Sequence, residues 1–452
     1  MSFSPFHLSL TILTTVLGLS AAYLLRVPLA IGFAGGLGVL VVITLRQGVP
    51  VRILVQSMVT GMLHTKEVMY ILLLVGLLIP AWTASGTIPF LIDTGLKLLN
   101  PAYFVSFSFV FAAGISMILG TSTGTLSAVG IPLVGMGALL HIPLPLVAGA
   151  LVSGAFVGDR TSPFSSANQL VAASTGMTVP SQFRFLLPTT LLAFATALTF
   201  FVVADVNGNW KNAASLGHAS NDSLLPVEYA SQFHYSLWLW LPVAVLFGTI
   251  LLRFKTRYGF LLSIGISIVL GTLIQGVDAH QWLHGLWYGY ASEQLPSLHS
   301  KGVSSMIGLI ILIALAGAYN GILEETSAMQ PYMSRLFGNT SSQRSATVRT
   351  SLFGLALALL ACTQTLPIMM TGRNLLPLWE QKFPRGHLSR VVADAPLIFS
   401  AMVPWNLLAI LCGTILGVPV ERYAVFAVFL WTLPLYTWIV SYVVDINAAE
   451  TI

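Results

Sequence analysis

Charged residues are scarce in this sequence. Asp, Glu, Lys and Arg make up 8% of the 452 residues, whereas a soluble domain carries about a quarter. That scarcity excludes a soluble globular protein. Apolar runs take the place of the missing charges, because 56% of the residues are hydrophobic and the mean hydropathy is +0.85. The composition therefore predicts an all-α polytopic membrane protein.

Cysteines and basic patches are also lacking. Cys362 and Cys412 are the only two cysteines and both fall inside apolar segments, which argues against a disulfide framework and a metal cluster. Basic residues do not alternate with aromatic ones, so nucleic acid is not an expected partner. We expect no cofactor. Met1 to His7 contains no Lys or Arg, so the first apolar run is expected to be a retained helix and not a signal peptide.

The apolar runs predict about 11 to 12 membrane segments, because a helix needs roughly 20 apolar residues to cross a bilayer. We assign residues 1–452 to a single transmembrane domain. The run at 127–158 is long enough to be two pieces. The candidate spans are residues 8–25, 28–45, 67–86, 102–119, 127–158, 185–205, 235–252, 258–275, 303–323, 351–372, 392–413 and 423–443.

Basic loops predict the orientation, because short loops rich in Lys and Arg face the cytoplasm. The loop with Arg253, Lys255 and Arg257 is the clearest, and it places the 206–234 loop outside and the C-terminus inside. Basic loops flank 351–372 on both sides. Either that segment enters and returns on one side, broken near 362–367, or one of the loops violates the charge rule. The predicted location is the cytoplasmic (inner) membrane, with several crossings.

The same counting predicts an inverted duplication, because corresponding helices cross in opposite directions. Repeat one covers about residues 67–206 and repeat two about residues 303–443. Each half places a Thr-rich break before an Asp-to-Pro break: 120–125 corresponds to 362–367, and 159–163 corresponds to 394–396. We expect re-entrant hairpins or broken helices at these points, and a substrate site where the repeats meet.

Asp159 and Asp394 are the main candidates for a cation and proton site. A carboxylate at the bilayer centre costs about 2.5 to 3.5 kcal/mol, so it usually faces a cavity or a partner. The alternative is structural: Asp159 would pair with the neighbouring Arg160, and Asp394 with Arg390 one helical turn earlier. Glu325 is a third candidate acid, for which an interfacial acid pair with Glu324 is the alternative.

Side-chain oxygens near the breaks are candidate ion or substrate ligands, because Na⁺ is a hard cation that prefers oxygen. The alternative is that these groups bond to their own helices or to neighbouring ones. The candidates are Thr121, Ser122, Thr123, Thr125, Ser162, Ser165, Asn168, Thr363, Gln364, Thr365 and Asn406.

Gly120 to Gly124 also fits the Gly-x-Ser-x-Gly pattern of a serine hydrolase. That motif requires a strand, a sharp turn and a helix, and nothing in the sequence indicates a sheet. An intramembrane hydrolase is therefore a remote alternative.

At these residues the chain resembles the NhaC-type sodium/proton antiporters of the broader ion-transporter superfamily. The resemblance runs from about residue 120 to 420 and rests on ordered motifs. They are Gly120-Thr121-Ser122 with Gly124-Thr125, Gly154-Ala155 leading to Gly158-Asp159, Ser162-Pro163 with Ser165, Gly321 to Glu325, Leu388-Ser389-Arg390, Asp394, Pro404-Trp405-Asn406 and Gly417-Val418. It implies an inverted-repeat fold, an alternating-access cycle and a cytoplasmic membrane location.

The resemblance implies exchange of Na⁺ for H⁺, with Asp159 or Asp394 as the titrating group. The chain departs from the family pattern at Thr123, where many members carry Trp, and at Ser166, where an acid is common. A Na⁺-coupled transporter of a small organic anion or amino acid is therefore the alternative. The expected partners are Na⁺, H⁺ and the lipid bilayer, with a small organic solute and a second copy of the chain, in a homodimer, as further candidates.

Overall fold

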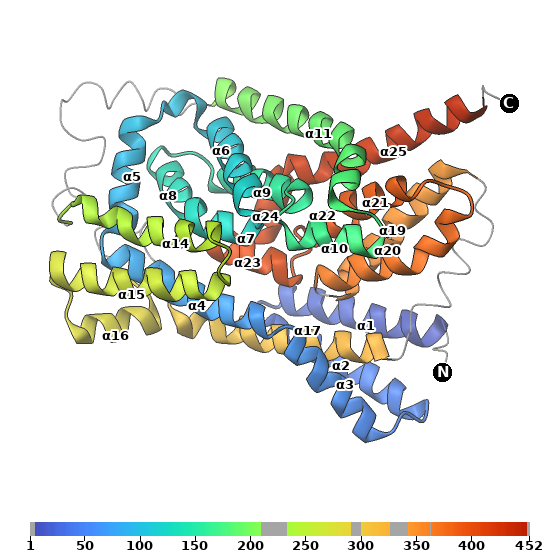
Figure 1. Ribbon diagram of the computed structural model, residues 1–452. Helices are drawn as coiled ribbons and strands as arrows, with labels where there is room; N and C mark the ends of the chain where they lie inside the picture. The colour runs from blue at the N-terminus through green and yellow to red at the C-terminus, as the bar shows by residue number, and fades with distance from the viewer. Residues whose placement is uncertain (1–4, 209–232, 291–299, 326–341, 362, 450–452) are drawn as a thin grey trace.

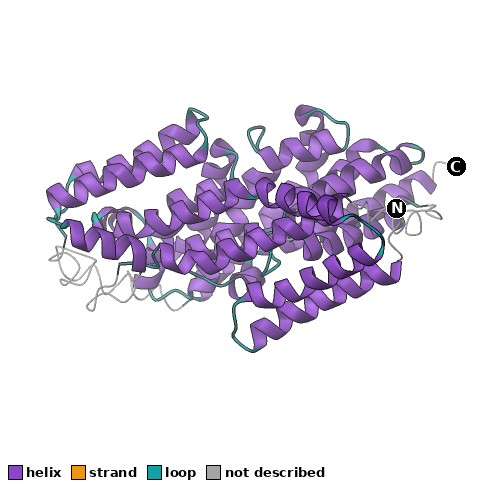
Figure 2. Ribbon diagram, turned by 90° about the horizontal axis from the view of Figure 1, so that it is seen from below, coloured by secondary structure: helices purple, strands orange, loops and turns teal. Residues whose placement is uncertain are grey.

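The computed structural model describes residues 5–208, 233–290, 300–325, 342–361 and 363–449, and all regular structure in them is helical (Figures 1 and 2). Seven of these helices are long and apolar enough to cross a membrane, or eight if one bent pair counts as a span, and three shorter apolar helices accompany them. The predicted all-α, multi-pass membrane protein is confirmed.

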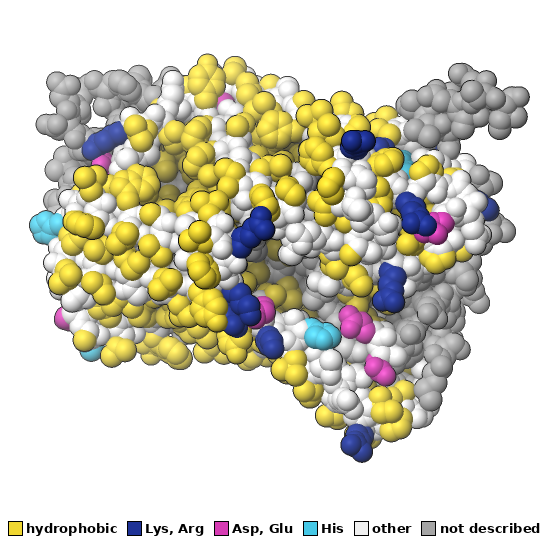
Figure 3. Space-filling view, viewed as in Figure 1, with side chains coloured by type: hydrophobic (Ala, Val, Ile, Leu, Met, Phe, Trp, Pro, Cys, Tyr) yellow, Lys and Arg dark blue, Asp and Glu magenta, His cyan; other side chains and the backbone are white. Residues whose placement is uncertain are grey.

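Nine helices coincide with predicted spans. They expose many large hydrophobic side chains, and the face in Figure 3 shows such side chains over α15 and its neighbours. The nine helices are α1 (Pro5–Leu24), α2 (Leu29–Arg46), α4 (Lys66–Ala84), α6 (Phe104–Leu119), α11 (Val179–Asn207), α14 (Leu241–Leu251), α15 (Thr256–Ile274), α17 (Ile307–Glu325) and α25 (Val428–Ala449).

Two predicted breaks are confirmed. The 127–158 run divides into α8 (Ile131–Leu139) and α9 (Leu144–Thr161), preceded by the short α7 (Ser122–Thr125) and the π-helical turn η2 (Leu126–Gly130). The 351–372 segment divides into α19 (Gln343–Ala361) and α20 (Thr365–Glu380), which pack against each other. Cys362 lies outside the described residues, as does most of the 206–234 loop.

The single span predicted over 392–413 is wrong, whereas the break predicted at 394–396 is confirmed. The chain forms α21 (Arg385–Asp394), the one-turn α22 (Pro396–Phe399) and α23 (Leu407–Leu416) instead. Proline lacks the backbone N–H that continues a helix, and Pro396 and Pro404 fall at these interruptions. The Asn406 side chain accepts a hydrogen bond from the Leu408 N–H at 3.1 Å and starts the next helix. After α23 the chain bends by 86° into the helical stretch Val420–Phe426, which includes α24 (Val420–Tyr423).

Four helices were not anticipated, because they are too short to form an apolar run of spanning length. They are α3 (Val51–His64), α5 (Thr87–Leu98), α10 (Ser166–Ser174) and α16 (Ala279–Tyr288).

Most of the described helices form two groups that lie side by side, and α5 lies between them, packed against both α4 and α8 (Figure 1). The first helix group consists of α1 to α4 and α14 to α17, in which α17 packs along α2 and α3, and α15 packs along α4. The second helix group consists of α6 to α11 and α19 to α25, with the pair α6 and α9 at its centre. Both broken segments and both candidate aspartates, Asp159 and Asp394, belong to the second helix group.

Close packing of α6 against α9 depends on glycine. A Cβ added at Gly158 would lie 2.2 Å from the backbone carbonyl of Ser116, a distance that only a backbone shift relieves. We expect Gly158→Ala to destabilise the protein by about 1 to 3 kcal/mol, the usual cost of overpacking. Thermal unfolding of the purified protein in nanodiscs measures this. Gly114→Ala on the open face of α6 is the control, since a Cβ there meets nothing within 4 Å; equal unfolding midpoints for both variants would contradict the prediction.

Candidate functional site

The Asp159 carboxylate lies near the end of α9, with 5% of the residue exposed. The Ser122 hydroxyl donates to one carboxylate oxygen at 2.7 Å. The Ser165 hydroxyl lies 3.2 Å from the other oxygen and donates to the Asp159 backbone carbonyl at 2.6 Å. In the described part of the chain, no basic side chain forms an ion pair with Asp159. The result is a buried acid surrounded by hydroxyl groups.

Local backbone geometry brings these hydroxyls to Asp159. Helix α6 ends at Gly120 with a φ of +69°, and a Cβ there would lie 2.6 Å from the Phe164 backbone, so glycine is required. Thr121 then caps α7, which places Ser122 in its first turn. Ser165 caps α10 by accepting from the Asn168 N–H at 3.2 Å. The breaks at 120–125 and after Pro163 therefore meet at one carboxylate.

The other hydroxyls of the first break form hydrogen bonds within their own segment. Thr121 and Thr123 hydrogen-bond each other at 3.2 Å, and the Thr125 hydroxyl donates to the Thr121 carbonyl at 2.8 Å. Each of these contacts stabilises the turn itself. In this structure the local-bonding alternative describes these three threonines.

Ser162 and Asn168 hold the backbone next to the site and do not bond to Asp159 itself. The Ser162 hydroxyl donates to the Met117 carbonyl at 2.8 Å, and the Asn168 amide donates to the Ser162 carbonyl at 3.0 Å. Gln182 on α11 in turn donates to the Asn168 side-chain oxygen. These contacts fix the backbone on both sides of Pro163, and no hydrogen bond from either side chain to Asp159 is present.

The second break contributes one group to Asp159. The Gln364 side chain interacts with the Asp159 carboxylate and also donates to the Leu397 carbonyl at 3.3 Å. Thr363 instead accepts from the Asn320 amide of α17 at 3.4 Å, and Thr365 is exposed at the start of α20. The two breaks predicted to pair thus meet through Gln364.

Asp394 has a different environment, because it forms a fully buried ion pair with Arg160. The other Asp394 oxygen accepts a hydrogen bond from Thr437 on α25. Arg160 also donates to Thr189, at 2.8 Å, and to Thr190 on α11. This network joins α9, α11, α21 and α25, and it leaves Asp394 with a neutralised charge.

The ion pairs expected if both acids were structural, Asp159 with Arg160 and Asp394 with Arg390, do not form. Arg160 pairs with Asp394, 234 residues away, and not with its neighbour Asp159. Consecutive residues on a helix do not face each other, so Arg160 leaves α9 on a different face from Asp159. Arg390 donates to the Phe185 carbonyl at 2.6 Å instead of bonding to Asp394.

The remaining candidates lie apart from Asp159. Glu325 is exposed at the end of α17, beside the exposed Glu324. Asn406 caps α23, and its buried amide nitrogen has no hydrogen-bond partner. Sequence reasoning missed Thr437, Thr189 and Thr190, since nothing in the sequence relates them to Asp394.

The described residues contain no group of three or more His, Cys, Asp or Glu side chains placed to hold a metal ion. They also contain no β-strand. The Gly120 to Gly124 stretch connects two helices, so it is not the strand-turn-helix elbow of a hydrolase.

Comparisons with known proteins agree with the resemblance. A family model described as the Na⁺/H⁺ antiporter family matches residues 168–444. The chain is 28% identical over 380 residues to an uncharacterized Na⁺/H⁺ antiporter of Haemophilus influenzae, covering 81% of this chain and 80% of that protein. It is 26% identical to the malate-2H⁺/Na⁺-lactate antiporter of Bacillus subtilis, covering 90% and 88%. It is 25% identical to the Na⁺/H⁺ antiporter NhaC of Alkalihalophilus pseudofirmus, covering 85% and 84%.

Proposed function

Because the chain belongs to the Na⁺/H⁺ antiporter family and is therefore a secondary active antiporter and not an enzyme, we propose that it exports Na⁺ in exchange for H⁺ at the Asp159 carboxylate. The observation that carries the proposal is the surroundings of this acid. It is buried and lined by the hydroxyls of Ser122 and Ser165, and no basic side chain of the described residues neutralises it.

Competition for one carboxylate accounts for the exchange. Oxygen ligands suit a hard cation such as Na⁺, and Asp159, Ser122 and Ser165 offer carboxylate and hydroxyl oxygens. A proton on the carboxylate removes the charge that holds the cation. Na⁺ and H⁺ therefore exclude each other from the site, which is the minimum requirement for antiport by alternating access.

Asp394 and Arg160 take a positioning role in this proposal. Their charges cancel in a fully buried pair, so Asp394 does not need to bind the transported cation. The pair connects α9, which carries Asp159, to α21 and α25 of the same helix group. It fixes the position of the Asp159 helix while the site exchanges its ions.

We further propose the inverted duplication, with repeats at about residues 67–206 and 303–443, and a location in the cytoplasmic membrane with the C-terminus inside. The duplication is supported by the arrangement of the breaks. Helices α6 and α8 flank the first break, and α19 and α20 flank the second at the other end of the second helix group (Figure 1). The homodimer stays a prediction, which the mass of the purified protein in nanodiscs tests.

Ser122 offers a direct test of the cation site. Ser122→Ala removes a hydroxyl bonded to Asp159 at 2.7 Å, so we expect the apparent KM for Na⁺ to rise about tenfold, equivalent to about 1.4 kcal/mol. Proteoliposomes with a pH-sensitive dye inside measure the exchange. Ser108→Ala is the matched control, because this buried hydroxyl of α6 bonds only to the Phe104 carbonyl of its own helix. An unchanged KM in Ser122→Ala would remove this serine from the site.

A second candidate function is Na⁺-coupled exchange of a small organic anion. One relative is named a malate-2H⁺/Na⁺-lactate antiporter and aligns with 90% of the chain. Uptake of radiolabelled malate and lactate and Na⁺/H⁺ exchange are to be measured in the same proteoliposome preparation. Na⁺/H⁺ exchange without any organic solute supports the first proposal, whereas exchange that requires malate or lactate replaces it with the second.

A further inference from the structure

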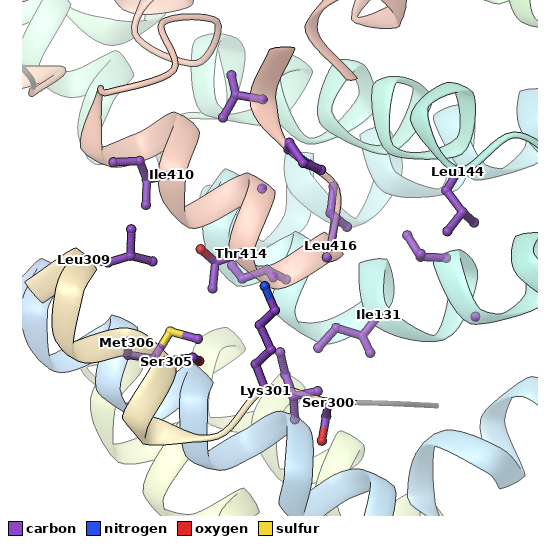
Figure 4. Close-up of a pocket in the computed structure, with 18 of the residues that line it drawn as sticks. Ile131, Leu144, Ser300, Lys301, Ser305, Met306, Leu309, Ile410, Thr414 and Leu416 are labelled. Atoms are coloured by element: carbon purple, nitrogen blue, oxygen red, sulfur yellow. The ribbon is translucent and has the colours of Figure 1, made fainter. Parts of the chain in front are cut away.

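A cavity of about 710 Å³ lies between the two helix groups, apart from Asp159. One wall comes from α4, α5 and the start of α17, and the other comes from α8, α23 and the loop that follows α23 (Figure 4). No group of the Asp159 site lines it. Helix α23 forms part of this wall and also contacts α7, so the cavity and the carboxylate lie on different sides of α23.

The size of the cavity indicates an organic ligand. Sites for small organic molecules measure about 300 to 1,000 Å³ and have mostly apolar walls with a few polar groups. Here Ile131, Leu309 and Ile410 are among the apolar lining residues, and Ser305 and Thr414 are among the hydroxyl groups. Neither Na⁺ nor H⁺ needs an apolar chamber of this volume.

The charge of the ligand follows from Lys301. Among the described residues it is the only basic one that lines the cavity, and its amine extends toward Thr414 and Leu416 (Figure 4). No ion pair of Lys301 is present among the described residues. Of the acidic side chains that the structure describes, Glu421 alone lines the cavity, and it interacts with another group. The positive charge of Lys301 is therefore the one that remains available to a ligand.

We propose that this cavity binds a small amphipathic carboxylate that enters from water. Its carboxylate pairs with the Lys301 amine, and its apolar body packs against Ile131, Leu309 and Ile410. Because α4 and α17 belong to the first helix group and α8 and α23 to the second, the bound molecule contacts both groups. This site is separate from Asp159 and does not depend on the proposed exchange of Na⁺ for H⁺.

Equilibrium binding of radiolabelled 3-phenylpropanoate to the full chain in nanodiscs tests the proposal, with binding to empty nanodiscs subtracted. We expect saturable binding that neutral 3-phenylpropanamide does not displace. Lys301→Met should raise the Kd by about tenfold or more, whereas Lys301→Arg should retain binding. Lys97→Met is the matched control, because Lys97 on α5 is already paired with Asp93 at 2.8 Å.

A second variant tests the cavity itself without changing the charge of Lys301. Ile410→Trp fills part of the cavity and should reduce binding although Lys301 is intact, and thermal unfolding checks that each variant folds. Asp159→Asn should bind 3-phenylpropanoate normally, even though it should not exchange ions. Equal binding by wild type and Lys301→Met would overturn the proposal. So would the absence of saturable binding, as expected for a cavity filled by lipid chains, or loss of binding in Asp159→Asn alone.

Discussion

Asp159→Asn should reduce Na⁺-dependent proton exchange to the level of protein-free liposomes while leaving a folded protein. Asn keeps the size of the side chain, and its one amide oxygen can still accept from Ser122 or Ser165 while its amide nitrogen donates to the other hydroxyl, so the packing of α9 survives. What it loses is the negative charge, which both binds Na⁺ and takes up the proton. An uncharged group at this position leaves nothing for the two ions to compete for.

The measurement is Na⁺-induced collapse of a proton gradient in everted vesicles, repeated with purified protein in proteoliposomes. Asp93→Asn is the control, because Asp93 forms an i,i+4 pair with the half-exposed Lys97 and contacts no group of the site. Asp159→Glu keeps the charge and should retain part of the activity. Wild-type exchange in Asp159→Asn would show that another group carries the ions.

Removing either partner of the Arg160–Asp394 pair should strongly destabilise the protein. A buried charge left without its partner costs about 3 to 5 kcal/mol, and both side chains are fully buried. We expect Arg160→Met and Asp394→Asn each to lower the yield of folded protein and its thermal midpoint. The double variant Arg160→Met with Asp394→Leu should recover most of the loss, because it leaves no unpaired charge.

Arg385→Met is the matched control, since Arg385 pairs with Glu380 at 2.9 Å while about half of its side chain is exposed. Such a surface pair contributes about 0 to 1 kcal/mol. Wild-type stability in both single variants of the buried pair would contradict the prediction. The double variant also decides which aspartate carries the ions. If the folded double variant exchanges Na⁺ for H⁺, Asp159 carries the ions. If it folds but does not exchange them, Asp394 carries the ions.

The sequence predicted the position of the helix breaks well, because each depends on local chemistry. Gly120 ends α6 in a left-handed conformation, and Pro163 follows the end of α9. In 392–413 the break at Pro396 was predicted in the same way, but the apolar composition of the segment favoured a continuous span and hid the second interruption at Pro404.

Contacts between distant segments could not be predicted in the same way. Ser122 and Asp159 are 37 residues apart, and Gln364 comes from the other half of the chain. The similarity between the polar stretches 120–125 and 362–367 suggested that they meet, and Gln364 does reach Asp159. The similarity did not indicate that Thr363 would face Asn320 of α17.

By itself, the sequence determined that this protein is a helical membrane protein with interrupted helices and buried acids. Hydrocarbon leaves backbone groups no water to bond with, so long apolar runs must form helices. Only the tertiary structure decided which acid is neutralised. Arg160 follows Asp159 directly, yet its side chain leaves α9 on another face and pairs with Asp394. The choice depends on which face of each helix meets its neighbours, and that is a property of the packed molecule.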